Sequence, residues 1–372
     1  MGTAADFPVK WISSAMPRAP KLYRTVGGAL AVLDAFLVTG WGAMTPQRIE
    51  IAGGVATVQC NSGDTFHEYA VIEVSGAEPA ALNGQHRVLS STDTSFTFAT
   101  EAADGHATGT ISIKYAPAGW ERVFSGENKA VYRSAAPDAS GALYRIDNTN
   151  ADATFQGYAA MSDVDTGDYP FPNQNTLLLN HMENTTETQE KEYFMAADGY
   201  GVIVSNKKFS AGGDGMSPFF FGASSPIDGG SMTLKHEVVL GSPGGWISNQ
   251  EKGLVSQSFG CFSATDNEGG VLSSDVACSF SLLSTEGLDV NKQSAVVLSR
   301  CLGIRDGVVF GMAPGIYSTW QGNAMNAVPE QSMMRCHING KPRVLYSAYY
   351  GGWAYPNQQA GVFTVDITGP WR

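Results

Sequence analysis

Three aspartates stand close together in the segment Asp163-Val164-Asp165-Thr166-Gly167-Asp168. Hard cations such as Ca²⁺ bind clustered oxygen atoms, and a calcium loop begins with an Asp-x-Asp pair near a glycine. No acidic residue follows where an EF-hand would be completed, since Asn175 and Thr176 stand there. The segment therefore carries two hypotheses: a calcium site formed by Asp163, Asp165 and Asp168, or a surface turn in which aspartate accepts hydrogen bonds from backbone N–H groups.

Histidine and cysteine show no spacing typical of a metal site. The chain has 6 His and 5 Cys, and no two cysteines form the close C-x-x-C pair of a zinc site. Cys336 and His337 are adjacent, and neighbours on a strand point to opposite faces, so one metal ion would not easily bind both. We therefore expect no cofactor. We also expect buried free thiols, while a disulfide among the last four cysteines stays open. The cysteines are Cys60, Cys261, Cys278, Cys301 and Cys336.

Catalytic groups cannot be identified from spacing either. A Cys336 nucleophile would need a base, and nothing local supplies one. Glycan hydrolysis uses two acids about 5–10 Å apart that can come from anywhere in a fold, so the sequence does not exclude it. The acidic stretch from 180 to 192 has no apolar period and is typical of a solvated loop or a short exposed helix. We predict that the protein is not an enzyme.

Aromatic residues gather near the C-terminus, around Gly351-Gly352. Such residues pack in cores, anchor protein interfaces and stack on sugar rings, and all three interpretations stay open for this cluster. Asn357, Gln358 and Gln359 nearby could hydrogen-bond sugar hydroxyls. The cluster consists of Tyr346, Tyr349, Tyr350, Trp353 and Tyr355. A second aromatic run, Phe219-Phe220-Phe221, predicts a strand that is buried on both faces.

Residues 1 to about 26 have no amphipathic period and contain Pro8, Pro17 and Pro20. Each proline lacks a backbone donor and pushes the residue before it toward extended conformations. The segment is nevertheless too apolar for a solvated tail, because it contains Trp11, Met16, Leu22 and Tyr23. We predict an assembly arm that docks on another domain of the chain or on a neighbouring subunit through these four residues.

Composition excludes several classes of function. The net charge is −12 and no cluster of Lys and Arg is present, so we expect no nucleic-acid partner. The longest apolar stretch, Gly27 to Ala43, is interrupted by Asp34 and is shorter than the roughly 20 residues that span a bilayer. It also lies too far from the start to be a signal peptide. We expect no membrane insertion and synthesis in a cytoplasm.

The fold class that the pattern predicts is mainly β. Charge is low (16%) and the 43 Gly suit short strands joined by tight turns. We predict three parts: residues 1–45, an extended arm plus a short helix; residues 46–115, a small immunoglobulin-like β-module; and residues 116–372, a larger, irregular antiparallel β-sandwich domain. The helix spacing is Leu30, Leu33, Phe36 and Leu37, ending at Gly40. Gly53-Gly54 and Asn83-Gly84 predict hairpin turns.

Five segments together resemble virion structural proteins of tailed bacteriophages, a family of the tail and baseplate gene region without an assigned biochemical role. The resemblance runs nearly from end to end but is weak between about 175 and 340. The segments are KWISSAMPRAP (10–20), GALAVLDAFLVTGWG (28–42), APAGWERVFSGENKAVYRS (116–134), MSDVDTG (161–167) and VFTVDITGPWR (362–372). The resemblance implies a component of a virus particle and transfers no catalytic residue.

The resemblance and the arm together predict a structural subunit of the particle, in the tail, the baseplate or the region of tail-fibre attachment. It would act through oligomeric assembly as a homo-oligomer with other virion proteins as partners, and its location would be the virion. The alternative is a surface protein of the virion that binds a receptor or a host surface glycan, with the aromatic cluster exposed. A third hypothesis is a capsid decoration protein.

Overall fold

The structure of the protein is a computed structural model. It describes residues 8–171, 177–179, 190–210, 213–223, 236–240, 262–265, 271–274, 279–289, 295–305, 308–319, 332–338, 341–349 and 362–371.

The chain is mainly β, as its low charge and many glycines predict. All paired strands run antiparallel, in four large sheets and a two-stranded one, and the described residues contain a single α-helix. None of the helices in this part of the chain combines the length and apolar character needed to cross a lipid bilayer. The predicted fold class is confirmed.

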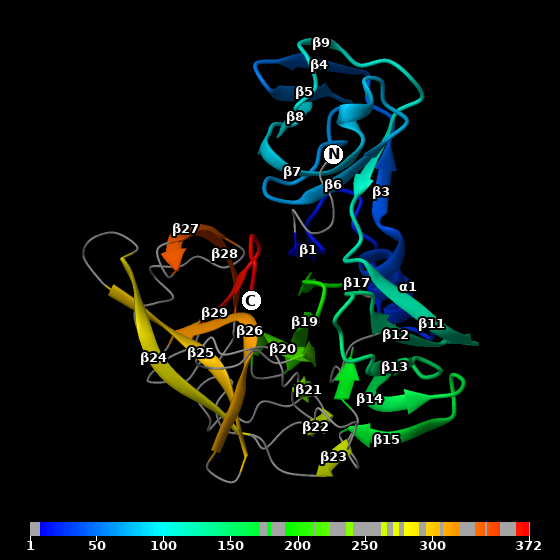
Figure 1. Ribbon diagram of the computed structural model, residues 1–372, viewed down its shortest axis with the longest axis vertical. Coiled ribbons are helices and arrows are strands. Elements are labelled where there is room, and N and C mark those ends of the chain that lie inside the picture. The colour runs from blue at the N-terminus through cyan, green and yellow to red at the C-terminus, as the bar shows by residue number, and fades with distance from the viewer. Residues whose placement is uncertain are drawn as a thin grey trace.

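The eight-stranded sheet lies at one end of the long axis of the molecule (Figure 1). Its order is β3-β10-β6-β7-β8-β5-β4-β9. Since β3 pairs with β10 through Trp41 and Tyr115, residues assigned above to the arm and helix also contribute to this sheet. The strands are β3 (Trp41–Met44), β4 (Arg48–Ala52), β5 (Val55–Gln59), β6 (Val71–Ser75), β7 (Gly84–Ser91), β8 (Ser95–Ala99), β9 (Gly105–His106) and β10 (Ser112–Tyr115).

The two predicted hairpin turns of this sheet have different outcomes. Gly53 and Gly54 both have positive φ, 58° and 78°, and join β4 to β5 in a tight hairpin as predicted. The prediction for Asn83-Gly84 is wrong. Asn83 follows a 3₁₀ helix, η2 (Ala80–Leu82), and its side chain accepts a hydrogen bond from the Ala77 N–H at 2.9 Å and donates one to the Ala77 carbonyl at 2.8 Å. This asparagine closes a longer connection with its side chain, a use that the dipeptide alone does not reveal.

The predicted helix is present and ends at the predicted glycine. Helix α1 (Gly28–Asp34) continues as one π-helical turn, η1 (Ala35–Thr39), and stops at Gly40, whose φ is 74°. Its apolar face is fully buried and packs against the main core. Asp34, half-buried near the end of α1, accepts hydrogen bonds from the Arg122 guanidinium at 2.5 Å and the Tyr132 hydroxyl at 2.7 Å. The helix is thereby fixed to the sheet that follows the eight-stranded one.

The N-terminus of α1 receives its capping group from a distant residue. Asn148 is fully buried, and its side-chain oxygen accepts a hydrogen bond from the Ala29 N–H at 2.9 Å. Its amide group donates to the carbonyls of Thr25 at 3.2 Å and Asn150 at 2.7 Å. Gly27, the residue before the helix, makes no side-chain cap. One asparagine therefore supplies both an acceptor to the helix and donors to the chain beside it.

Three further sheets make up the rest of the fold. One contains β11 to β16, a second has the order β1-β18-β19-β20-β21-β22-β23, and a third has the order β24-β25-β26-β29-β28-β27. The first comprises β11 (Trp120–Gly126), β12 (Lys129–Ser134), β13 (Leu143–Asp147), β14 (Ala153–Met161), β15 (Gly167–Phe171) and β16 (Leu177–Leu179). The second comprises β1 (Lys10–Ser13), β18 (Tyr193–Ala197), β19 (Gly201–Ser210), β20 (Gly213–Ala223), β21 (His236–Leu240), β22 (Phe262–Thr265) and β23 (Val271–Ser274). The third comprises β24 (Ser279–Asp289), β25 (Ala295–Arg305), β26 (Val308–Thr319), β27 (Met333–Ile338), β28 (Lys341–Tyr349) and β29 (Val362–Asp366). Strands β2 (Leu22–Tyr23) and β17 (Glu190–Lys191) form a short pair of their own.

The sheet of β11–β16 and the sheet of β18–β20 meet across aromatic rings. Phe221 lies between Tyr144, at 5.0 Å between ring centroids, and Phe155, at 4.4 Å, while Trp120 meets it edge-on at 5.5 Å. Phe219, Phe220 and Phe221 are all buried, so both faces of β20 are covered at this point. The prediction of a strand buried on both faces is confirmed.

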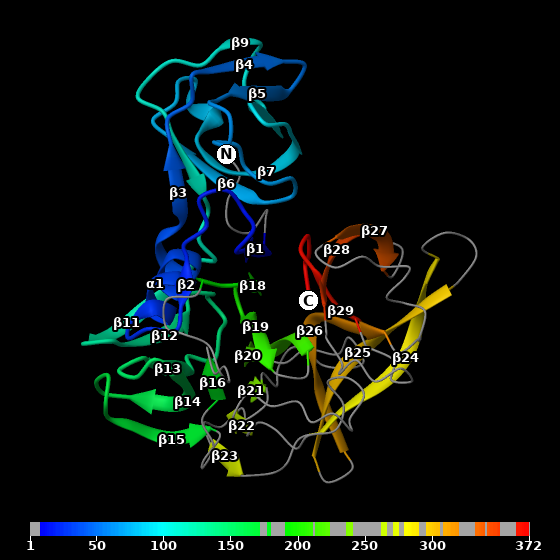
Figure 2. The same cartoon turned by 180° about the vertical axis from the view of Figure 1, so that it is seen from behind.

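The N-terminal segment is part of the fold of its own chain. Strand β1 pairs with β18 in the register Lys10↔Ala197 to Ser13↔Phe194. It lies between the eight-stranded sheet and β18 in both views of the molecule (Figure 1, Figure 2). The segment expected to dock on another domain or on a neighbour is thus seen here as the edge strand of a sheet inside the same chain.

We expect Asn148→Ala to lower the free energy of unfolding by about 1–3 kcal/mol, because it leaves buried donors and acceptors around the start of α1 unpaired. The measurement is chemical denaturation followed by fluorescence. The control is Asn61→Ala, the same substitution at an exposed asparagine whose bonds are to Gln47 and Asp64. It should change stability by no more than about 0.5 kcal/mol. Equal losses in the two variants would contradict the role of Asn148.

Candidate functional site

Both ends of the chain meet the eight-stranded sheet at one place, which we call the junction. It consists of β1, the turn and strand residues Tyr69 and Arg87, the aromatic residues Phe194 and Tyr346, and the C-terminal residues Asp366–Thr368. Sequence separations across it reach 333 residues between Ser13 and Tyr346.

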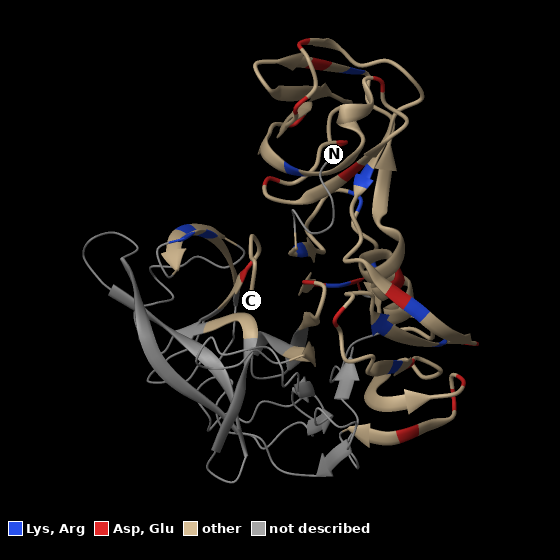
Figure 3. Ribbon diagram, viewed as in Figure 1, with Lys and Arg blue, Asp and Glu red and all other residues tan. Residues whose placement is uncertain are grey.

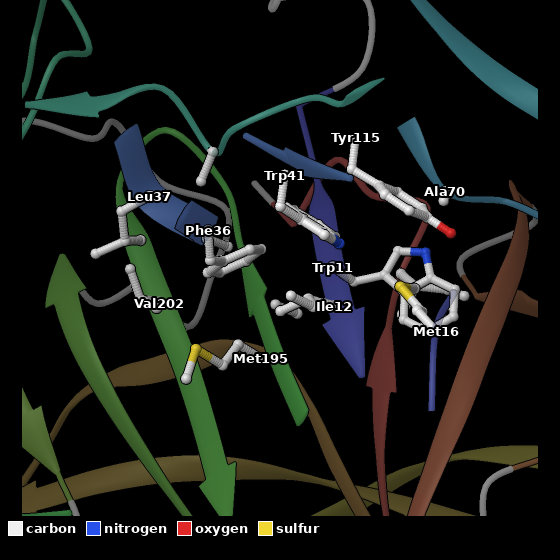
Figure 4. Packing of buried hydrophobic residues seen from close by; sticks show 14 of the residues in the cluster. Trp11, Ile12, Met16, Phe36, Leu37, Trp41, Ala70, Tyr115, Met195 and Val202 are labelled. Atoms are coloured by element: carbon white, nitrogen blue, oxygen red, sulfur yellow. The ribbon is translucent and has the colours of Figure 1, made fainter. Parts of the chain in front are cut away.

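Trp11 fills the centre of the junction. It is 2% exposed, and its ring centroid lies 5.1 Å from His67, 6.2 Å from Phe194 and 5.3 Å from Tyr346. Phe194 and Tyr346 stack on each other at 4.6 Å. Figure 4 shows Trp11, Ile12 and Met16 from the N-terminal segment among core residues of several other elements. A single tryptophan therefore joins three sheets by apolar contact.

Tyr69 accepts hydrogen bonds from residues of β1, β7 and β27. Its φ is 65°, a left-handed conformation that an aromatic residue adopts only when its surroundings impose it. Its carbonyl accepts hydrogen bonds from Arg87 at 2.9 Å and from the Trp11 indole at 3.4 Å. Its hydroxyl oxygen accepts one from Arg335 at 2.6 Å. These contacts come from three different sheets and fix the strained residue.

Arg87 connects the eight-stranded sheet to the C-terminal segment. Its guanidinium donates to the carbonyls of Ile367 at 3.1 Å and Thr368 at 3.4 Å. Burial lowers the pKa of Arg87 to about 10, while the carboxylate of Asp366 acts in the opposite direction. At neutral pH the guanidinium keeps its charge, so it is a buried cation held by carbonyl dipoles.

Asp366 shapes the C-terminal turn that Arg87 contacts. It is 2% exposed and forms an ion pair with Arg343 at 3.1 Å. Its carboxylate also accepts hydrogen bonds from the N–H groups of Thr368 at 2.9 Å and Gly369 at 3.0 Å. Gly369, with a φ of 55°, leaves no room for a side chain because a Cβ there would collide with Val9. The last residues and the first described ones are therefore in direct contact.

Lys10 adds a second buried cation to the junction. It is 3% exposed, and burial, together with the charge of Arg87, lowers its pKa to about 8. Along the ribbon of the described chain, Lys and Arg are spread over several strands and alternate with Asp and Glu (Figure 3). The junction combines apolar burial, strand pairing and buried charge, which suits it to holding parts of the molecule together.

The predicted calcium site is not supported by the geometry. Among the residues that the structure describes, no group of three His, Cys, Asp or Glu side chains could hold a metal ion. Asp163 instead accepts hydrogen bonds from the N–H groups of Asp165 at 2.7 Å and Thr166 at 2.8 Å, and these bonds lower its pKa. Asp165 pairs with Lys129 at 2.7 Å and Arg145 at 2.9 Å. Asp168 lies in β15, where its backbone pairs with Ala160. The alternative, an aspartate-capped surface turn, describes the segment.

The aromatic cluster near the C-terminus is partly core. Tyr346 is 5% exposed and stacked in the junction, so the hypothesis of an exposed, glycan-stacking ring is wrong for this residue. Tyr349 ends β28, where its backbone pairs with Val362. Tyr350, Trp353 and Tyr355 lie outside the described residues.

The predicted arm residues lie as follows. Trp11, Met16 and Leu22 are buried in the main core of their own chain, and Tyr23 is partly exposed in β2, where it pairs with Glu190. Their role in contacts between subunits stays a prediction. Cys60 and Cys336 are buried free thiols, as expected; the predictions for the other three cysteines concern side chains outside the described set.

Sequence analysis missed Tyr69, Arg87 and Asp366. Arg87 lies in an alternating strand and Tyr69 just before one, with nothing nearby to mark a special role. Asp366 belongs to the C-terminal segment VFTVDITGPWR, which carried part of the family resemblance. An acidic residue within an apolar strand was the available signal, because such a residue needs a partner when it is buried.

Comparisons with known proteins add little to this geometry. No protein-family model and no curated protein sequence matches the chain. Among solved structures, the chain is similar to phage phi92 endosialidase at 9% sequence identity with a TM-score of 0.18. The match covers 99% of this chain and 59% of that one, so the chain spans less than two thirds of the endosialidase chain. A TM-score this low is no evidence of a shared fold.

We expect Arg87→Met to lower the free energy of unfolding by about 1–3 kcal/mol, because it leaves the buried carbonyls of Tyr69, Ile367 and Thr368 without their donor. Arg335→Met is the matched control, since this arginine also contacts Tyr69 but its side chain is 77% exposed. It should cost about 0–1 kcal/mol. Denaturant titration of both variants measures the difference. Similar losses of unfolding free energy in the two variants would show that the greater burial of Arg87 does not make its contacts more stabilising.

We expect stability to depend on pH through Lys10. With a folded pKa of about 8 against an ordinary value of 10.5, the unfolded chain binds more protons between these values, so stability rises as pH increases from 8 to 10.5. The gain relative to Lys10→Met should reach about 3 kcal/mol. Denaturation midpoints of both proteins across this pH range measure it. If the denaturation midpoints of the two proteins changed with pH in the same way, the lowered pKa of Lys10 would be contradicted.

Proposed function

We propose that the chain is a structural subunit of a bacteriophage particle, in the tail, the baseplate or the region of tail-fibre attachment. It acts by assembling with copies of itself and with other virion proteins, and it carries out no chemical step. The protein is made in the cytoplasm of the host and ends in the virion.

The observation that carries the proposal is the connection between the five segments that resemble phage virion proteins. They are far apart in the sequence, yet four of them contact one another in the fold, and the fifth contacts Val9, the residue before the first. Arg18, in the first segment, donates a hydrogen bond to the Gly42 carbonyl, in the second, at 3.0 Å. The Ala118 N–H, in the third, donates to the Phe36 carbonyl, in the second, at 2.8 Å.

The other two segments join the same network. Lys129, in the third segment, pairs with Asp165, in the fourth, at 2.7 Å. Gly369, in the fifth, lies so close to Val9, next to the first, that no side chain would fit. The resemblance thus follows a connected framework that includes the junction. This supports the proposal, because the segments that carry the resemblance form one connected unit in the fold although they are far apart in the sequence.

The alternative, a protein that binds a receptor or a glycan, predicts an exposed aromatic cluster. The burial of Tyr346 removes one member from such a surface. No observation favours the third hypothesis, capsid decoration, over the tail. The structural role in the tail region is therefore the function that we propose.

We expect antibodies against the chain to label purified phage particles at the tail by immunogold electron microscopy. Light scattering of the purified protein should also give the mass of a homo-oligomer, two or more times 39.4 kDa. Arg87→Met serves as a control for correct folding, since a protein with a broken junction should not enter particles. A chain that is absent from particles and monomeric at all concentrations would contradict the proposed function.

A further inference from the structure

Strand β1 is an edge strand that its own chain holds from one side. Its ladder neighbour is β18, through four residue pairs from Lys10↔Ala197 to Ser13↔Phe194. All four of its residues are buried, and Trp11 and Ile12 belong to the main core. A fold without this strand would leave a long apolar gap in the junction that a strand of the same sequence fits.

The connection that follows β1 is tightly folded and strained. Two turns follow each other, closed by hydrogen bonds from the Met16 N–H to the Ser13 carbonyl at 2.9 Å and from the Ala19 N–H to the Met16 carbonyl at 3.1 Å. Arg18 has a φ of 58°, a left-handed conformation unfavourable for a residue with a side chain. Pro17 and Pro20 flank it and favour extended backbone. Short hinge loops under strain favour exchange of the element they connect.

The chain is held to its own body again from Pro20 onward. The Pro20 carbonyl accepts a hydrogen bond from the Tyr193 hydroxyl at 2.6 Å. Arg24 makes a two-pronged ion pair with Asp152 at 2.8 and 2.6 Å, with both side chains partly buried. The part that can leave therefore ends before Pro20.

We propose that β1 is exchanged between copies of this chain, so that the β1 of one subunit pairs with β18 of its neighbour and completes the neighbour's junction. The proposal rests on the proposed function, since it specifies how the subunits assemble. The partner is a second copy because the gap left by β1 is shaped for Trp11 and Ile12 and for the backbone of β18.

The energetics favour exchange at high subunit concentration. An exchanged strand makes the same contacts as the original one, so the junction itself does not distinguish the two states. Opening the turns gives up the hydrogen bonds from Arg18 to the carbonyls of Gly42 and Thr65, at 3.0 and 3.4 Å, its ion pair with Asp64 at 3.4 Å and the burial of Met16. It also relieves the strain at Arg18. The seven steps from the Cα of Ser13 to the Cα of Pro20 would span up to about 24 Å when extended, enough to reach an adjacent subunit.

The order in which the chain folds also favours exchange of β1. The ladder partner of β1, β18, lies about 180 residues later in the chain, and Tyr346 lies 333 residues after Ser13. Closing loops of this length is slow and entropically costly. While the junction forms, the β1 of a neighbouring subunit competes for the same place, and growth of a particle supplies neighbours at high local concentration.

Two cysteine variants co-expressed with different tags test the proposal. One chain carries Lys10→Cys and the other carries Ala197→Cys, the register partners of β1 and β18. A disulfide between the two chains can form at this pair only if the strand is exchanged. We expect a mixed-tag species of twice 39.4 kDa on non-reducing gels, with the linked peptides identified by mass spectrometry.

Two controls separate strand exchange from accidental cross-linking of the native cysteines. Each variant co-expressed with the unsubstituted chain should give no such linked peptide. A single chain carrying both substitutions should link within itself where the strand is not exchanged. If this pair prevents folding, Ile12→Cys with Met195→Cys uses the next but one rung of the same ladder. Linkage confined to single chains, with no mixed species, would overturn the proposal.

The hinge offers a second measurement. Arg18→Gly accepts the left-handed turn without strain and should lower the fraction of exchanged chains about fivefold. Arg18→Ala removes the same hydrogen bonds but keeps the strain, so it should not lower that fraction. A chain present in particles without mixed disulfides would leave the proposed function standing and refute the exchange. Absence from particles would refute the function while the disulfide result still decides the exchange.

Discussion

The burial of β1 between separate sheets is the interaction on which the rest of the structure depends. Trp11 contacts His67 next to the eight-stranded sheet, Phe194 in β18 and Tyr346 in β28, so one side chain brings together residues from distant parts of the chain. Burying a large aromatic side chain contributes a few kcal/mol, roughly in proportion to the apolar area removed from water. The same contact also fixes where the sheets lie with respect to one another, because the ring touches each of them.

Buried charged groups make the arrangement of the junction specific, which the apolar contact of Trp11 alone does not. Removing Lys10, Arg87 and Asp366 from water is costly, and a core of apolar residues of the same volume could be as stable. Arg87, however, donates hydrogen bonds to the carbonyls of Tyr69, Ile367 and Thr368, and each bond requires its carbonyl to lie at the correct distance. The charged groups therefore select one arrangement of the C-terminal segment against the eight-stranded sheet. If the chain is a structural subunit as proposed, this selection is a reason to keep an arrangement that stability alone does not favour, because such a subunit must present defined surfaces to its neighbours.

The framework formed by α1, β11, β12 and the N-terminal segment is held by side chains that reach across elements. Asp34 joins the helix to Arg122 and Tyr132, and Asn148 joins the same helix to a hairpin of the following sheet. Asp34, Arg122 and Tyr132 lie in segments that resemble phage virion proteins, and Asn148 binds the backbone of one of these segments at Ala29. In the proposed strand exchange, Arg18, with a φ of 58°, lies in the hinge between β1 and this framework.

The sequence by itself determined the local structure. The mainly β class, the Gly53-Gly54 hairpin, the helix that ends at Gly40 and the buried strand of Phe219–Phe221 follow from periodicity and turn chemistry, which act over a few neighbouring residues. The sequence left two hypotheses open for Asp163 and three for Tyr346, and the structure selected the capped turn and the core. The tertiary structure alone showed that Asn83 closes a connection with its side chain. It also made Tyr69, Arg87 and Asp366 partners, although Tyr69 and Arg87 are separated from Asp366 by most of the chain. Contacts between residues so far apart leave no local pattern, because they depend on where the packing of whole sheets places each side chain.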